Sequence, residues 1–372
     1  MTRGFGGVRM GGGPRSSRPL RGLAASFVVS FVLLALSAIG ISTSAAPPTP
    51  TFVAVDLGAL AGATDSRATA INDIGEVVGV SGGLPFVWSA SAGMRPLPEM
   101  DDWAFTTPHD INAGGLVVGE TRVLGLGLGI LWTRTLNGYD ASLLPLPAGF
   151  DESFAFGLND QGAAVGCMRG PSLPQLAVVW KPAGAVYGVP ESLPGLPETS
   201  SDCATSVNED GDVAGWSGPV LPGPYHAVRW TRRVAAFEVR DLGVLRGGFW
   251  SQAWGINDRG AVVGESSSSG DAIHGFLWSH ALRDLGTLGG FTSSARAINN
   301  DGFVVGSSAT SLGTVHAYLV ARRVKIDLGT LPGGTSSFAT DINELEVIAG
   351  ASTVAGSTGD HATLWLPTGS PG

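Results

Sequence analysis

The stretch INDIGEVVG, residues 71–79, recurs through this chain and decides its fold. Further copies, with variations, begin at Ile111, Leu158, Val207, Ile256, Ile298 and Ile342. Asn-Asp-x-Gly between two short apolar runs predicts a tight hairpin turn, because Asn, Asp and Gly tolerate positive φ. The asparagine is present in all seven copies, and we expect it to be a structural turn residue: Asn72, Asn112, Asn159, Asn208, Asn257, Asn299 and Asn343.

Each copy belongs to a longer repeat with four expected strands. Successive asparagines lie 40, 47, 49, 49, 42 and 44 residues apart. One strand precedes the turn and one follows it, a third ends in Trp in six copies, and a fourth often ends in Asp-Leu-Gly. Four strands in a repeat of this length are typical of a propeller blade. The sequence therefore predicts an all-β, seven-bladed β-propeller of four-stranded blades.

The two ends of the repeat region complement each other. Residues 52–58, FVAVDLG, form a fourth strand with no first three before it, and Trp365 ends a third strand with no fourth after it. We expect the N-terminal strand to complete the last blade, which removes an open sheet edge. The expected domains are a signal segment at 1–46, a Pro-rich linker at 47–51, the propeller at 52–366 and a short tail at 367–372.

These residues resemble the bacterial extracellular HAF repeat family, named for a His-Ala-Phe motif. Four copies carry a variant of it, at His226-Ala227-Val228, His274-Gly275-Phe276, His316-Ala317-Tyr318 and His361-Ala362-Thr363. The likeness covers about Val55 to Trp365, because the Asp-Leu-Gly and Asn-Asp-x-Gly elements accompany the motif. The resemblance implies an exported repeat protein and no particular biochemical activity.

The N-terminal region has the order of an export signal. A basic region is followed by the uncharged apolar residues 22–41 and then by small residues, as in a secretory signal peptide. The apolar stretch is also long enough to be an uncleaved membrane anchor. Either alternative places the repeats outside the cytoplasm, extracellular or periplasmic, and contact with a membrane is expected only through this segment.

Composition excludes some partners. Without residues 1–46, which hold five arginines and no acid, 17 basic residues remain beside 31 acidic ones, a net charge of −14. Such a chain is not expected to bind nucleic acid, whose phosphates attract Lys and Arg.

The most variable loops are expected to lie on the face opposite the Asn-Asp-x-Gly turns. Aromatic residues in or near them are the candidate ligand contacts: Trp103, Trp216, Tyr225, Trp250 and Trp254. Exposed aromatic planes stack on sugars or anchor protein partners; the alternative is that these residues pack between blades. The histidines are expected to be structural, since one per blade, without a local pair, does not make a metal site. No cofactor or metal is expected.

Catalytic signatures are weak. Gly79-Val80-Ser81-Gly82-Gly83 matches G-x-S-x-G, but the helix that a nucleophile elbow needs does not follow. The acids Asp101, Asp102, Glu198 and Asp202 fall in loops between blades, and sequence cannot show whether carboxylates converge. We therefore expect a monomeric, non-enzymatic binding or scaffolding module for a protein or glycan. The alternatives are an extracellular carbohydrate-active hydrolase or lyase and a surface structural protein.

The only two cysteines, Cys167 and Cys203, lie in neighbouring repeats. An even count in an exported chain is compatible with a disulfide. We expect both to lie near the variable-loop face of adjacent blades, where a bridge between them is a hypothesis.

Overall fold

The computed structural model describes residues 50–100, 104–184, 186–219, 223–234, 236–357 and 359–368. They belong to one unit, residues 50–371. Apart from a single 3-10 turn, η1 (Ser269–Asp271), every regular element in this part of the chain is a β-strand. None of the described elements is a helix able to cross a membrane. The expected signal segment lies outside the described residues.

Two sheets follow each other at the start of the repeat region, each in simple antiparallel order. The first consists of β2 (Ser66–Ile71), β3 (Val77–Ser81), β4 (Leu84–Ser89) and β5 (Gly93–Pro96). The second consists of β6 (Ala104–Ile111), β7 (Val117–Val123), β8 (Leu126–Thr135) and β9 (Gly138–Leu143).

Two eight-stranded sheets come next, and each consists of two four-stranded halves. In the first sheet, one half consists of β10 (Glu152–Leu158), β11 (Ala164–Gly170), β12 (Leu173–Trp180) and β15 (Glu191–Ser192). The other half consists of β16 (Ser201–Val207), β17 (Val213–Gly218), β18 (His226–Arg232) and β19 (Phe237–Gly243). A separate ribbon pairs β13 (Pro182–Ala183) with β14 (Val186–Tyr187). In the second eight-stranded sheet, one half consists of β20 (Ser251–Ile256), β21 (Val262–Ser267), β22 (Ile273–Trp278) and β23 (Leu282–Asp284). The other half consists of β24 (Gly289–Ile298), β25 (Val304–Thr310), β26 (Val315–Ala321) and β27 (Val324–Gly329). A single parallel residue pair joins the halves in each case, Gln175 with Ser201 and Ile273 with Thr292.

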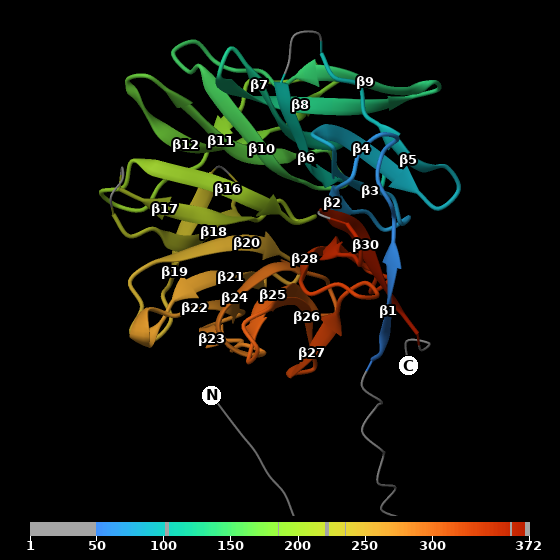
Figure 1. The fold of residues 1–372 in the computed structure, drawn as a ribbon. Coiled ribbons are helices and arrows are strands. Elements are labelled where there is room, and N and C mark those ends of the chain that lie inside the picture. Colours follow the sequence, from blue (N-terminus) through green and yellow to red (C-terminus); the bar gives the residue numbers. More distant parts are fainter. Residues whose placement is uncertain are drawn as a thin grey trace, which may run out of the picture. The chain divides into compact units, whose positions relative to one another are not determined.

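The last sheet combines the two ends of the repeat region. It contains β28 (Ser337–Ile342), β29 (Ile348–Thr353), β30 (Asp360–Pro367) and, on its edge, β1 (Phe52–Asp56). β1 runs antiparallel to β30, from Phe52 opposite Pro367 to Asp56 opposite Thr363 (Figure 1). The predicted pairing of the N-terminal strand with the last Trp strand is therefore present.

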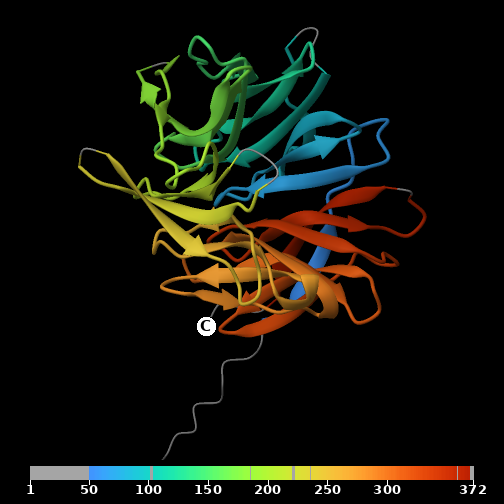
Figure 2. The ribbon, with the colours of Figure 1, turned by 90° about the vertical axis from the view of Figure 1, so that its left-hand side faces the viewer.

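The core consists of apolar clusters between neighbouring sheets. One cluster joins Ala68 and Ile71 of the first sheet to Ala349 and Leu364 of the last. Figures 1 and 2 show the sheets following one another in colour order, with the red strands of the last sheet beside the blue strands of the first. The chain is thus an all-β protein of stacked four- and eight-stranded sheets.

A β-bulge interrupts the first strand of every repeat, in β2, β6, β10, β16, β20, β24 and β28, which we call the first strands. The closing glycine of the repeat motif lies opposite the bulge. A Cβ atom at Gly264, for example, would lie 2.0 Å from the carbonyl oxygen of Gln252. This close approach explains why the closing glycine is present in every copy.

Candidate functional site

The repeat asparagines bring the first strands together. The side-chain Nδ2 of each donates to the main-chain oxygen of the next repeat's asparagine, at 2.9–3.3 Å. The series runs from Asn72 to Asn343, and Asn343 donates to the oxygen of Asn72. All these asparagines are buried. Seven turns separated by up to 271 residues therefore surround one hollow.

That hollow has a volume of about 190 Å³. Around its mouth, the residue after the asparagine accepts a hydrogen bond, through its side chain, from the main chain of the preceding turn in six of the seven repeats, at 2.7–3.0 Å. The exception is Ala113, which has no acceptor in its side chain. Five of these acceptors are carboxylates: Asp73, Asp160, Glu209, Asp258 and Glu344. The described residues contain no group of three or more His, Cys, Asp or Glu side chains that could hold a metal ion.

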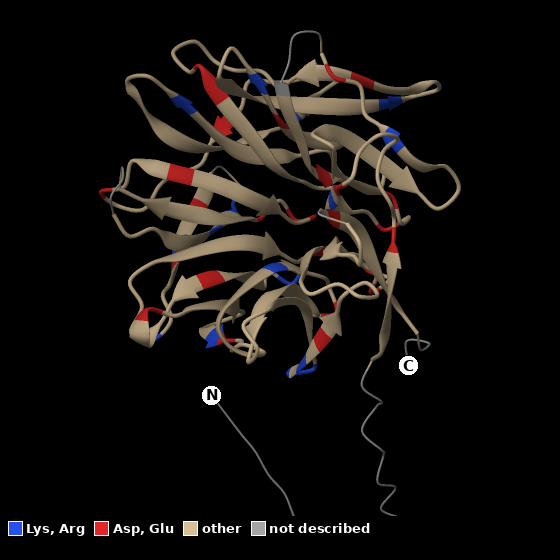
Figure 3. Ribbon diagram, in the orientation of Figure 1, with Lys and Arg blue, Asp and Glu red and all other residues tan. Residues whose placement is uncertain are grey.

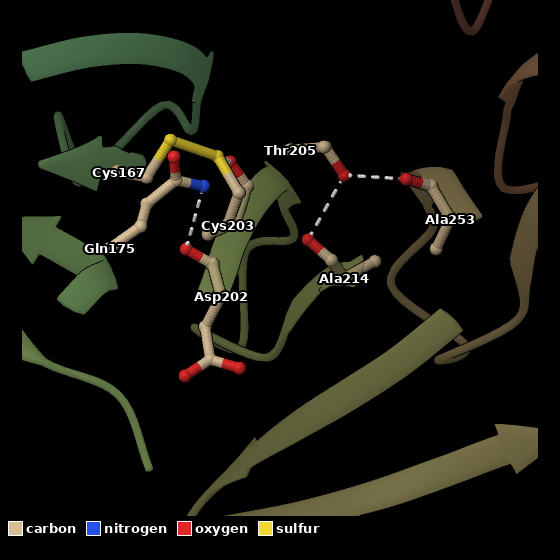
Figure 4. Close-up of a disulfide and its surroundings, with 8 residues drawn as sticks. Cys167, Gln175, Asp202, Cys203, Thr205, Ala214 and Ala253 are labelled. Atoms are coloured by element: carbon tan, nitrogen blue, oxygen red, sulfur yellow. Dashed lines mark hydrogen bonds between the residues drawn. A yellow bond between two sulfur atoms is a disulfide. The ribbon is translucent and has the colours of Figure 1, made fainter. Parts of the chain in front are cut away.

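The bulges of the first strands place a second set of residues beside the neighbouring sheets. Thr205, the extra residue of its bulge, donates to the oxygen of Ala214 in its own sheet at 3.1 Å and to that of Ala253 in the next at 2.9 Å (Figure 4). The bulge residue and the one after it are, in repeat order, Thr69-Ala70, His109-Asp110, Phe156-Gly157, Thr205-Ser206, Trp254-Gly255, Arg296-Ala297 and Thr340-Asp341. We call the space that the first strands surround the channel; the hollow of about 190 Å³ at its turn end is lined by the turn residues and not by these pairs.

Two carboxyl groups in the channel have unusual surroundings. Asp110 accepts hydrogen bonds from the amides of Ile111 and Leu158, at 2.8 and 2.7 Å. Asp341 accepts from those of Ile342 and Ile71, at 2.8 and 2.9 Å. Both keep some contact with solvent. Each carboxyl spans from its own strand to the next first strand, so the pair belongs to the channel wall.

Burial raises the pKa of both groups. The pKa of Asp110 rises to about 6, mainly through desolvation. That of Asp341 rises to about 8, through desolvation and then through the negative charge of Asp110. Hydrogen bonds from main-chain amides oppose these shifts without cancelling them. Both pKa values are raised, and that of Asp341 is raised further, so Asp341 would hold its proton at a pH at which Asp110 is ionised; paired base and acid catalysis needs this order.

The bulge residues also include aromatic and basic side chains. The ring of His109 lies 5.0 Å from that of Phe156, and burial lowers the pKa of His109 to about 4. The guanidinium carbon of Arg296 lies 4.7 Å from the ring centre of Trp254. Within the described part of the chain, His109 Nε2 and Trp254 Nε1 have no hydrogen-bond partner although both atoms are buried.

The aromatic residues singled out in the sequence occupy different places. Trp103 lies outside the described residues. Trp216 and Tyr225 contact each other edge to face, with ring centres 4.6 Å apart. The main-chain oxygen of Trp250 accepts a hydrogen bond from the amide of Ser267 at 3.0 Å. Only Trp254 lies in the channel, as the extra residue of the bulge in β20.

The repeat histidines bond to the Asp-Leu-Gly aspartates. Nδ1 of each lies 2.8–2.9 Å from a carboxylate oxygen, in the pairs His226–Asp241, His274–Asp284, His316–Asp327 and His361–Asp56. The same aspartates accept from the glycine amide two residues on, at 2.7–2.8 Å. In each pair, the histidine and the aspartate lie on neighbouring strands of the same sheet. These contacts account for both motifs as structural features.

Cys167 and Cys203 form a disulfide, with Cα atoms 4.9 Å apart. It joins β11 to β16, and thus one half of an eight-stranded sheet to the other (Figure 4). Close by, Gln175 donates to the oxygen of Asp202 at 3.3 Å. The hypothesis of a bridge between neighbouring repeats agrees with this arrangement.

Comparison with known proteins identifies the fold. No family model matches the sequence, and no curated protein is similar to it. Among solved structures, a puromycin-hydrolyzing peptidase of Mycobacterium tuberculosis is 12% identical with a TM-score of 0.55, over 88% of this chain and 55% of that one. A streptogramin B lyase is 11% identical with a TM-score of 0.46, over 85% and 98%. A gluconolactonase of Xanthomonas campestris is 12% identical with a TM-score of 0.40, over 85% and 89%. The likeness to the peptidase structure, together with the sheets described above, supports a propeller-type all-β fold.

The comparisons correct the expectation of a non-enzymatic binding or scaffolding module. A solved structure similar to this chain is a peptidase, so the lack of a local catalytic motif does not argue against an enzyme. The physical reason is that Asp110 and Asp341 are 231 residues apart and act on each other only in the folded chain. The signal missed in the sequence is the residue two before each repeat asparagine, which is an acid in these two copies alone.

Proposed function

We propose that this chain is a carbohydrate-active hydrolase on a closed, seven-bladed propeller, in which Asp341 is the general acid and Asp110 the general base. The observation that carries the proposal is a pair of carboxyl groups on first strands whose pKa values are both raised by burial, with the charge of Asp110 raising that of Asp341 further. Trp254 and Phe156 lie in the same layer of bulge residues, where aromatic rings can stack on a sugar ring.

Three observations support the closed propeller. The eight-stranded sheets divide into four-stranded halves at single residue pairs. The asparagine hydrogen bonds return from the last repeat to the first. Asp56 of β1 bonds to His361 as the other aspartates bond to the histidines of their own sheets. Each four-stranded unit would then be one blade, with β1 completing the seventh.

In the proposed reaction the protonated Asp341 donates its proton to the oxygen of the leaving sugar. Ionised Asp110 takes a proton from the attacking water, so that the bond to the sugar carbon forms as the glycosidic bond breaks. His109 is neutral at this pH, since its pKa is about 4, and it leaves the carboxyl pair without a competing positive charge.

We also propose that the protein is an exported member of the HAF repeat family. The His–Asp pairs link the two motifs on which the resemblance rests. The Cys167–Cys203 disulfide is consistent with an oxidising compartment. A glycan outside the cytoplasm would then be the substrate.

The test is the release of reducing sugar from a panel of oligosaccharides by the purified protein and by D110N and D341N. We expect kcat/KM to rise through about pH 6 and to fall through about pH 8, because Asp110 must be ionised and Asp341 protonated. Each variant is expected to lose at least about 100-fold in kcat. D110N should also lose the rise of kcat/KM near pH 6, and D341N the fall near pH 8. Turnover that survives in both variants, or products that carry a new double bond, would overturn the proposal.

A further inference from the structure

Arg296 is a basic group without a counter-ion. Its side chain is half-buried on β24, and within the described part of the chain no carboxylate or hydrogen-bond acceptor pairs with it. Arg229, which is also half-buried, is paired with Asp212 at 2.5 Å. In a chain whose repeat region has an excess of acids, an unpaired guanidinium beside the channel calls for an anionic partner.

Its neighbours suit such a partner. Arg296 stacks on Trp254 at 4.7 Å, which fixes the guanidinium plane but leaves its N–H groups free. Trp254 Nε1 is a second donor without a partner, and it belongs to the adjacent first strand. Trp254 Nε1 and the Arg296 guanidinium are thus two hydrogen-bond donors on neighbouring first strands without an acceptor in the described part of the chain, and charge-assisted bonds to a carboxylate would satisfy such donors.

The location relative to the catalytic pair decides the ligand. Arg296 is the bulge residue of β24, and Asp341 follows the bulge residue of the next first strand, β28. We propose that Arg296 and Trp254 bind the carboxylate of a sugar acid, so that the substrate is a uronate-containing glycan. This inference rests on the proposed hydrolase, whose substrate class it names.

Charge also indicates the end from which such a substrate would enter. The turn-side mouth is surrounded by five carboxylates, which repel an anion. Figure 3 shows acidic residues in red and basic residues in blue on the same ribbon. An acidic glycan would therefore enter at the opposite end, where the first strands begin, and meet the bulge residues before it meets the turns.

The test measures binding separately from turnover. Isothermal titration calorimetry compares a trisaccharide of galacturonic acid with the matching neutral trisaccharide of galactose. The protein carries D341N to prevent cleavage, or D110N if the first variant does not fold. We expect at least about 10-fold tighter binding of the acidic sugar, the factor that one charge-assisted hydrogen bond provides. Added R296Q should abolish this preference without weakening the neutral sugar, and R296K should keep part of it.

The matched control is R240Q. Arg240 also stacks on a tryptophan, Trp278, at 5.0 Å, but it is exposed on β19, outside the set of bulge residues. This variant should leave both affinities unchanged. Equal binding of the two sugars, no binding of either, or an unchanged preference in R296Q would overturn the inference. Hydrolysis of neutral glycans alone would overturn the uronate site and support the hydrolase. Binding of the acidic sugar without turnover by the unmodified protein would support the uronate site and overturn the hydrolase.

Discussion

Glu346 occupies a turn position that glycine fills in the other six repeats. Those glycines have φ between 70° and 81°, and Glu346 has φ of 62°. A side chain in the left-handed region costs about 1 kcal/mol. We therefore expect E346G to raise the free energy of unfolding by about 1 kcal/mol in urea titrations, because it restores the residue that this backbone favours.

The matched control is the same turn of the preceding repeat. Gly302 has φ of 80°, and a Cβ atom added there would have no other atom within 4 Å. G302E should therefore lower stability through backbone strain alone, by about the amount that E346G gains. If E346G is neutral while G302E is destabilising, contacts of the Glu346 side chain offset the strain and the explanation is wrong.

At the same scale, the repeat residues could be interpreted from the sequence and the channel residues could not. Asn72 and its six equivalents stand in a recognisable turn motif, so their structural role follows from local geometry. Asp110 and Asp341 precede that motif, and they face the channel only because a bulge reverses the strand's alternation. In a regular strand the two side chains would lie on the other face of the sheet. The alternation of apolar and polar residues in the sequence does not reveal where a bulge shifts the register.

At the scale of elements, the disulfide supplements a weak junction. β12 and β16 share one residue pair, Gln175 with Ser201, and the bond between Cys167 and Cys203 adds a covalent link across 36 residues. A loop of this length corresponds to about 4 kcal/mol of stabilisation in the chain-entropy model. We expect the C167A/C203A variant to lose about this amount in denaturant unfolding. Reductant should destabilise the unmodified protein and leave the variant unchanged; an equal response of both would contradict a stabilising bridge.

The repeat motifs in the sequence were sufficient to predict which strands pair at the two ends of the repeat region. Residues 52–58 were expected as the fourth strand of the last repeat, and β1 occupies Phe52–Asp56 beside β30. Asp-Leu-Gly and the histidine motif could be found separately, but the bond between them required the antiparallel register of the third and fourth strands. Pairing partners across strands depend on register, which loop lengths alone do not determine.

At the scale of the whole molecule, β1 carries the proposed closure. Deleting residues 1–58 would leave the edge of β30 unpaired and His361 without Asp56, whereas deleting residues 1–49 would leave both contacts. We expect the longer deletion to aggregate or to melt at a lower temperature, measured by light scattering and calorimetry. A synthetic peptide of residues 50–58 should restore part of the melting temperature. Identical behaviour of the two deletions would show that closure contributes nothing to stability.

The two channel carboxyls give the folded molecule a pH dependence that no single repeat has. Folding raises the pKa of Asp341 from 3.8 to about 8, so the folded state holds a proton that the unfolded state has lost. Stability must therefore fall as pH rises between about 4 and about 8 and then level off. The raised pKa of Asp110 likewise makes the free energy of unfolding fall as pH rises, up to about pH 6. D341N cannot ionise, so its unfolding free energy should depend less on pH than that of the unmodified protein, in urea titrations from pH 5 to pH 9. Parallel curves for the two proteins would mean that Asp341 is already ionised in the fold, and with that the assignment of Asp341 as the acid would fall.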